Sequence, residues 1–291
     1  MVIETIDKTY TVIGFAKSDE AIKRYICKDA SDRREYMVLC VCERHWIEEL
    51  MTFFLTHEAE GKFRDYHGCF VADGNLHLVF SYHEGQSLKD RLEKQGCTLE
   101  ERIGIFGELL EQLMLLSMPD GVASDVLTVD KILASDANEI AFRYELANPA
   151  AVIKNDKLDM QKKLLAVYDH LFAGELKRRT VLPLLDYRDI IRPGEYDNVF
   201  EAYRLLKVFT GIIDELAPED RDTPHTKGYL FWEKVKGVFP IVRRIVMLVI
   251  AGVAVGFLVW SAWNSLRSEQ KDIVFDQIGT YEIDTTVEEG K

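Results

Sequence analysis

Cysteine and histidine are the first residues to consider for chemistry, because these types supply many nucleophiles and metal ligands. The chain has five cysteines and seven histidines. The cysteines show no CxxC spacing and the histidines no HExxH or His-x-His spacing, so the sequence predicts no metal site. Cys40 and Cys42 share one apolar run, where we expect the thiols to point to opposite faces of a strand. We expect the cysteines to be buried, reduced thiols of a cytosolic domain, at positions Cys27, Cys40, Cys42, Cys69 and Cys97.

The sequence supports neither a serine nucleophile nor a pair of catalytic carboxylates. The sequence has no GxSxG motif, which would place a serine nucleophile on a sharp turn. Asp and Glu total 49 against 36 Lys and Arg, which gives a net charge of −13. Such a surplus of carboxylates is typical of a solvated acidic surface, and it makes a nucleic-acid partner unexpected.

The elements of the first 85 residues are mostly strands. Runs rich in β-branched and aromatic residues predict strands over 10–15, 21–27, 36–42, 69–72 and 76–80. Asp73-Gly74-Asn75 is a strong hairpin signal between the last two strands. Apolar residues at helical spacing predict one inserted helix over 46–55.

The pattern then changes to helices. Ser87 is expected to cap a short helix, and Thr98 with Glu101 forms a capping box before a long helix that ends at Pro119-Asp-Gly121. Two short strands are expected over 131–134 and 139–144. Further helices are expected over 157–172 and 198–216.

This order of elements resembles the protein kinase fold, an α+β fold of two lobes. The segment from Phe80 to Leu92, which reads FSYHEGQSLKDRL, is similar to a kinase hinge that enters the helical lobe. The segment from Asp125 to Leu146 is similar to the catalytic-loop hairpin. We therefore predict a kinase-like domain over 1–216, with an N-lobe over about 1–83 and a shortened helical C-lobe over about 84–216.

Phosphoryl transfer needs positioned charges, so the resemblance implies particular groups in the N-lobe. A glycine-rich loop is expected in the first hairpin, where only Gly14 is present. A lysine is expected in the third strand of the lobe, but residues 36–43 contain none. The nearest cations, Lys28, Arg33 and Arg34, lie in the preceding turn. The candidate glutamate partners Glu48 and Glu49 are then expected to be solvated charges of the helix.

The C-lobe positions depart from the family as well. Aligning Lys131-Ile-Leu with the family's Asn-Ile-Leu places Val126 at the catalytic aspartate and Lys131 at the metal-binding asparagine. Tyr144-Glu-Leu146 then replaces Asp-Phe-Gly, and Asp125 lies one position away from the catalytic aspartate. Valine cannot accept a proton, and protonated lysine cannot bind Mg²⁺. We therefore predict a pseudokinase with no catalytic residues, no metal and no cofactor.

A membrane helix is predicted near the C-terminus. Residues 245–263 read IVMLVIAGVAVGFLVWSAW and contain no charge. A helix of this length spans about 29 Å, close to the thickness of the hydrocarbon core. Arg243 and Arg244 before the helix, and Trp260 and Trp263 at its far end, are expected to anchor it at the two interfaces.

The predicted topology follows from the flanking charges. Lys and Arg favour the N-terminal flank, so we expect a single-pass protein of the cell membrane with its N-terminal domain in the cytoplasm. Residues 217–244 are a linker with a basic juxtamembrane segment, and 264–291 are a short extracytoplasmic tail. No signal peptide is expected at the acidic N-terminus. Gly252 and Gly256 form a GxxxG motif that could support self-association.

A pseudokinase domain, a linker and one membrane helix resemble the EssB/YukC family of type VII secretion. The resemblance implies a non-catalytic scaffold whose partners are other membrane or secretion-machinery proteins, in contact with the lipid bilayer. The sequence departs from the family after the helix, because the tail is much shorter than the family's external domain. Two alternatives stay open, a membrane-bound nucleotide-binding signalling regulator and a divergent active kinase.

Overall fold

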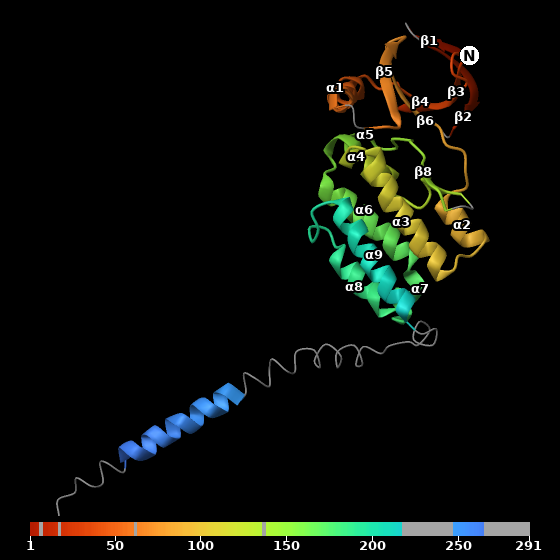
Figure 1. Cartoon of the computed structure of the whole chain (residues 1–291). Coiled ribbons are helices and arrows are strands. Elements are labelled where there is room, and N and C mark those ends of the chain that lie inside the picture. The colour runs from red at the N-terminus through yellow and green to blue at the C-terminus, as the bar shows by residue number, and fades with distance from the viewer. Residues whose placement is uncertain (6–7, 17–18, 61–62, 136–137, 217–246, 265–291) are drawn as a thin grey trace, which may run out of the picture. The chain divides into compact units, whose positions relative to one another are not determined.

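The computed structural model describes residues 1–5, 8–16, 19–60, 63–135, 138–216 and 247–264 (Figure 1). The chain divides into two compact units, Met1–His225 and Thr226–Lys291. The first unit holds a β-rich lobe followed by a helical lobe. The described part of the second unit is one helix. The predicted linker over 217–244, with Arg243 and Arg244, lies outside the described residues, as do Ile245, Val246 and the tail over 265–291.

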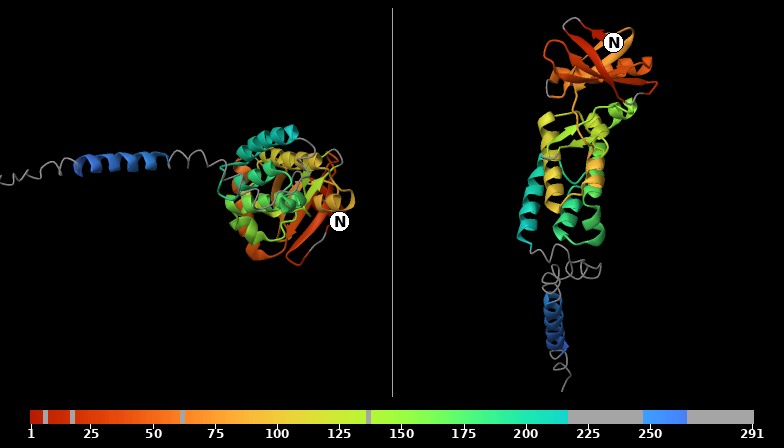
Figure 2. Two further views of the ribbon diagram at one scale, coloured as in Figure 1. Left: turned by 90° about the horizontal axis from the view of Figure 1, so that it is seen from below. Right: turned by 90° about the vertical axis from the view of Figure 1, so that its right-hand side faces the viewer.

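The β-rich lobe is one antiparallel sheet with a helix inserted between its fourth and fifth strands. Its elements are β1 (Val2–Glu4), β2 (Thr9–Phe15), β3 (Ile22–Asp29), β4 (Glu35–Val41), α1 (Arg44–Glu60), β5 (Tyr66–Ala72) and β6 (Asn75–Ser81). The strand order is β1-β2-β3-β4-β6-β5, and the sheet curls strongly (Figure 2). The five expected strands and the inserted helix are confirmed. The short edge strand β1 is additional, and three residues give too little pattern for a separate prediction.

The strand β4 has buried side chains on both faces, which explains its nearly continuous apolar sequence. Met37, Leu39 and Val41 face α1 and join a core that continues into the helical lobe. Tyr36 and Val38 alternate with them and belong to a second, smaller cluster. One face of the sheet therefore packs against itself through the curl, and the other face packs against the rest of the domain.

The expectation for Cys40 and Cys42 was wrong. Residues two apart in a strand share a face, and the two sulfur atoms lie 3.9 Å apart at the end of β4. All five cysteines are free thiols, of which only Cys27 and Cys40 are fully buried. Burial raises the pKa of the Cys27 and Cys40 thiols to about 12, so both stay protonated at neutral pH.

The helical lobe begins with two capped helices, as the sequence predicts. Ser87 accepts from the Asp90 amide ahead of α2 (Leu88–Lys94), and Thr98 forms the expected capping box with Glu101 ahead of α3 (Leu99–Leu116). The long helix ends earlier than expected, because Ser117 adopts a left-handed conformation with φ of 49°. Pro119-Asp-Gly121, which was expected to end α3, instead begins α4 (Asp120–Val126).

The rest of the lobe surrounds α3 (Figure 1). The strands β7 (Ile132–Ala134) and β8 (Ile140–Phe142) and the helices α6 (Lys157–Leu171) and α9 (Val199–Glu215) match expectation. The short helices α5 (Pro149–Lys154), α7 (Ala173–Arg178) and α8 (Leu182–Ile190) were not predicted. Phe106 of α3 contacts the rings of Tyr168 and Tyr187, whose hydroxyls donate to the Leu184 and Ala202 carbonyls. The rings of Tyr168 and Tyr187 thus fill the core while their own hydroxyls stay hydrogen-bonded.

The second unit contains an apolar helix over Met247–Asn264. Its mean hydropathy is 1.8 over 18 residues and none of it is buried, so by length and composition it could cross a membrane. Gly252 and Gly256 lie one turn apart on it with no neighbouring atom within 4 Å of an added Cβ. Trp260 and Trp263 are exposed near its end.

Gly121 provides a test of how closely α4 packs on α5. A Cβ at this position would lie 1.8 Å from the Val152 carbonyl oxygen, so Gly121→Ala must displace backbone. We expect it to lower the free energy of unfolding by about 3 kcal/mol. Gly211→Ala in α9 meets no atom within 4 Å and should instead stabilise the protein by up to about 1 kcal/mol. Thermal unfolding of both variants, followed by circular dichroism, measures the difference. Equal stability of the two variants would contradict this packing.

Candidate functional site

The candidate site is the region where the β-rich lobe meets the helical lobe. The strands β3 and β4 contribute from the β-rich lobe, and the turn after β8 contributes from the helical lobe. The segment 82–86 connects the lobes as the predicted hinge. The register of β7 and β8 pairs Ile132 with Phe142, which places Lys131 just before β7 and Tyr144 just after β8.

The face of β4 that points to this region carries no charge. Met37, Leu39 and Val41 occupy it and are at most 2% exposed. Glu48 and Glu49 of α1 are exposed on the helix, as expected for solvated charges. In this part of the lobe, the arrangement provides no lysine–glutamate pair that could hold a phosphate.

In the turn between β2 and β3, backbone amides bind the side-chain carboxylate of a residue in the same turn. The amides of Ala21 and Ile22 donate to Asp19 Oδ1 at 3.0 and 2.7 Å. Backbone amides in such a turn are the donors that a phosphate would need. Desolvation acts to raise the pKa of Asp19, but the bonds from the Ile22 amide and from Arg24 outweigh it and lower the pKa. The ionised carboxylate therefore already uses these donors.

Arg24 of β3 connects the two lobes. Its side chain is buried, and Nη1 lies 3.0 Å from Asp19 Oδ2. Its Nε donates to the backbone carbonyl of Glu145 at 2.8 Å, in the turn after β8. The guanidinium thus connects the β2–β3 turn to the turn after β8, where Asp-Phe-Gly was expected.

Two residues of the expected catalytic loop form an internal ion pair. Lys131 Nζ lies 2.7 Å from Asp125 Oδ2, and the two side chains are only 13% and 10% exposed. Val126, which was expected at the position of the catalytic aspartate, is fully buried at the end of α4. The ammonium group of Lys131 neutralises the Asp125 carboxylate, so Asp125 is held as part of the fold.

Tyr144, which was expected at the position of the metal-binding aspartate, donates its hydroxyl to Asp65 Oδ2 at 2.7 Å. His83 of the hinge lies 3.2 Å from the same oxygen through Nε2. Burial acts to raise the pKa of Asp65, but the bonds from His83 and Tyr144 outweigh it and hold the pKa below its usual range. Burial and the Asp65 charge raise the pKa of Tyr144 well above its usual value, so the phenol stays neutral. One carboxylate therefore joins the β-rich lobe, the hinge and the helical lobe.

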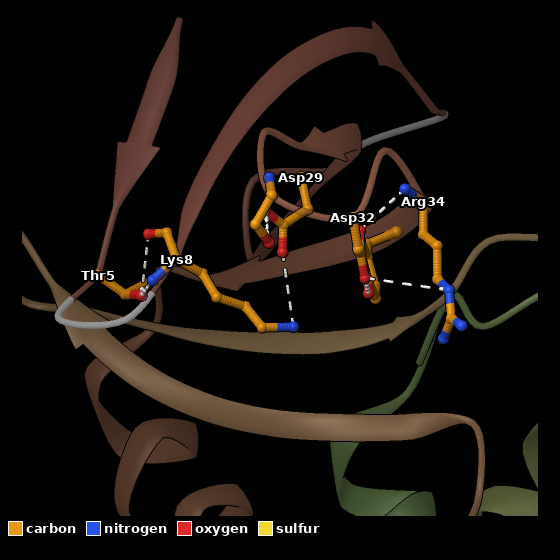
Figure 3. Close-up of polar contacts among 7 residues, drawn as sticks. Thr5, Lys8, Asp29, Asp32 and Arg34 are labelled. Carbon is orange, nitrogen blue, oxygen red and sulfur yellow. Dashed lines mark hydrogen bonds and ion pairs between the residues drawn. The ribbon is translucent and has the colours of Figure 1, made fainter.

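Two cations in turns of the β-rich lobe have partners within the lobe. Lys8 lies 3.5 Å from the buried Asp29 (Figure 3). It also lies 5.2 Å from the ring centre of Tyr36. Arg34 lies 4.0 Å from Asp32 and is 76% exposed in its side chain (Figure 3). Lys28 and Arg33 are exposed. The first contact joins the β1–β2 turn to the end of β3, and the second lies within the β3–β4 turn. The strand β4 itself contains no lysine.

The sequence did not identify four residues of this site. Asp19 and Arg24 lie in the first hairpin, where only a glycine-rich loop was expected, and Asp65 and His83 belong to no motif. The two contacts that join the lobes span 121 and 79 positions along the chain. Arg24 offered one signal, since a charged residue stands among the apolar inward positions of a predicted strand.

Comparison with known proteins places this geometry in a familiar fold. No protein-family model and no curated protein matches the sequence. The structure is similar to the PknI kinase domain of Mycobacterium tuberculosis, with a TM-score of 0.52 and 13% identity over 69% of this chain and 96% of that one. A double mutant of the same domain matches at a TM-score of 0.52, with 15% identity and the same coverage. The fold is kinase-like. At this identity the similarity extends to the fold alone.

The shared Asp65 carboxylate should make stability depend on pH. Because the folded pKa lies below the unfolded value of about 3.9, Asp65 stabilises the fold above that pH and loses this contribution as the pH falls through the folded pKa. Asp65→Asn should be less stable than wild type at neutral pH, and the difference should shrink below about pH 4. Urea titrations at several pH values measure this, with Asp73→Asn in an exposed turn as the control. A difference that stays constant down to pH 3 would contradict the role of Asp65.

Proposed function

We propose that the chain is a membrane-tethered pseudokinase that docks protein partners and transfers no phosphate. The observation that carries the proposal is the internal pairing at the catalytic positions. Lys131 is paired with Asp125, and Tyr144 with Asp65. The kinase-like fold supplies the architecture, and the chemistry is argued from these side chains alone.

Phosphoryl transfer depends on a metal ion that bridges the phosphates and on a base that orients the attacking hydroxyl. A protonated lysine and a neutral phenol supply no carboxylate or amide oxygen for Mg²⁺. Val126 offers no acceptor for the hydroxyl proton. Restoring one group would leave the others missing, so the loss of activity is expected to be complete.

The contacts of Asp19 and Arg24 support the same proposal, because they argue against nucleotide binding. A triphosphate would have to displace the Asp19 carboxylate from the amides of the β2–β3 turn. It would also separate Arg24 from Glu145 and so open the contact between the lobes. The protein's own groups already make the contacts that bound nucleotide and metal would otherwise make.

The helix over Met247–Asn264 supports the membrane tether. Eighteen residues rise about 27 Å, close to the hydrocarbon thickness, and their apolar side chains are exposed. We place the kinase-like domain in the cytoplasm and assign interface contacts to Arg243, Arg244, Trp260 and Trp263. The Gly252–Gly256 face is the proposed surface for self-association within the membrane. A component of a membrane assembly such as the type VII secretion machinery fits this architecture.

Nucleotide binding is the sharpest test of the non-catalytic assignment. Full-length protein in detergent should show no change in melting temperature with millimolar ATP, with or without Mg²⁺, and should incorporate no radiolabelled phosphate. Isothermal titration calorimetry checks the same point without heating. ATP binding without transfer would favour the signalling-regulator alternative, and transfer would establish a divergent active kinase.

The scaffold role predicts specific neighbours in the membrane. Crosslinking in native membranes, followed by mass spectrometry, should recover other integral membrane proteins with the full-length chain. Deletion of residues 247–264 should release the protein into the soluble fraction and remove these crosslinks. A full-length protein that remains a partner-free monomer in the membrane fraction would contradict the scaffold proposal.

A further inference from the structure

Two thiols lie side by side at the end of β4, on the face of the strand that belongs to the smaller apolar cluster. The sulfur atoms of Cys40 and Cys42 are 3.9 Å apart. The Cys42 amide donates to the Ala21 carbonyl at 2.9 Å, so the chain stays paired with its neighbour just beyond the end of β4. Cys40 is buried and Cys42 is partly exposed, so solvent reaches the pair from the Cys42 side.

The strands on both sides of β4 place one cation and one imidazole beside Cys40. Lys23 of β3 and His77 of β6 are its cross-strand partners, and paired residues share one face of a sheet. His77 is buried, and its ring is hydrogen-bonded to the Ala72 backbone, but its Nδ1 atom has no hydrogen-bond partner. A neutral imidazole that donates through one nitrogen leaves the other as a bare acceptor. A cation bound by the two sulfur atoms would therefore lie on the same face as an unused nitrogen lone pair.

The number and spacing of the ligands indicate which kind of ion fits. Among the residues that the structure describes, no three His, Cys, Asp or Glu side chains are placed to hold one metal ion, which argues against four-coordinate Zn²⁺. With metal–sulfur bonds of about 2.3 Å, two thiolates on opposite sides of an ion are about 4.6 Å apart, and they are closer when the angle bends. The observed 3.9 Å is near this spacing. Thiolates are soft ligands, and Cu(I) is a soft ion that accepts only two of them.

A disulfide between the two thiols fits the strand less well. Residues two apart in an extended strand have Cα atoms about 6.6 Å apart, near the upper limit of about 6.8 Å for disulfides. Forming the bond would bring the sulfur atoms from 3.9 Å to about 2.05 Å and would bend the chain where it is paired with Ala21. A bridging ion requires no such approach.

We propose that Cys40 and Cys42 bind one soft monovalent metal ion, such as Cu(I), between their two sulfur atoms. The ion replaces both thiol protons, which pass to water, and the resulting complex of one Cu(I) with two thiolates carries one negative charge. Lys23, directly opposite Cys40 on β3, offsets that charge. The inference does not depend on the proposed function, because the thiols lie on the face of β4 opposite to the one that points to the candidate site.

The test uses Cu(I) itself as the probe. Full-length protein in detergent, reduced and kept free of oxygen, is titrated into the coloured complex of Cu(I) with bicinchoninate, and the loss of colour measures the transfer of the ion. We expect wild type to take up one Cu(I) per chain and Cys42→Ser to lose this uptake. X-ray absorption at the copper edge should show two sulfur ligands in wild type. The matched control, Cys69→Ser/Cys97→Ser, removes two other partly exposed thiols and should take up Cu(I) as wild type does.

A second measurement needs no variant. Phenylarsine oxide bridges two neighbouring thiols and releases water, so treating folded wild-type protein with it should block the uptake of Cu(I). This arm keeps the proposal testable if circular dichroism shows that Cys42→Ser does not fold. The proposal would be overturned by no transfer of Cu(I) to wild type, by undiminished uptake in a folded Cys42→Ser or in arsenical-treated protein, or by an equal loss in the control variant.

Discussion

The Asp65 carboxylate is the contact on which the arrangement of the two lobes depends. A buried carboxylate is costly unless it is hydrogen-bonded, and Asp65 receives its bonds from Tyr144 in the helical lobe and His83 in the hinge. The Ser81 amide also donates to the Asp65 backbone carbonyl at 2.8 Å, which fixes the start of the hinge. Separating the lobes would remove the Tyr144 hydroxyl from this buried charge. The cost of leaving the carboxylate with fewer hydrogen bonds therefore helps to hold the lobes together, beside the Arg24–Glu145 contact and the apolar core that continues from one lobe into the other.

Other charged groups of the site are likewise satisfied within the protein, as Asp19, Arg24 and Asp125 show. Asp19 is held by two amides and Arg24, while Asp125 is held by Lys131. Such pairs contribute little net stability, since desolvation offsets much of the attraction. Breaking one of them is costly, however, because it leaves its partner buried and unpaired. These contacts support the proposal that the site does not repeatedly bind and release a charged substrate.

The sequence could predict the features that depend on residues close together in the chain, such as helix caps and tight turns. Ser87 and Thr98 cap their helices through side chains within three residues, and Asp73-Gly74 specifies its hairpin. The short helix α4 escaped prediction because its first turn contains Pro119 and Gly121, which usually mark a turn. Gly121 is required there by its contact with Val152, which only the fold reveals. Likewise, the expectation that kinase side chains are missing follows directly from the sequence. The Asp65 and Arg24 contacts could not be predicted, because their partners lie far apart in sequence.

The contact between Arg24 and Glu145 has an evolutionary consequence, because its acceptor is a main-chain oxygen. Every residue type presents the same carbonyl, so position 145 is free to change its side chain without losing the bond. Position 24 has no such freedom, because few side chains can reach across the two lobes and donate from a buried position. Only the donor residue of this contact between the lobes is therefore constrained. Among divergent sequences, position 24 in β3 would be conserved, whereas position 145 in the turn would be free to vary.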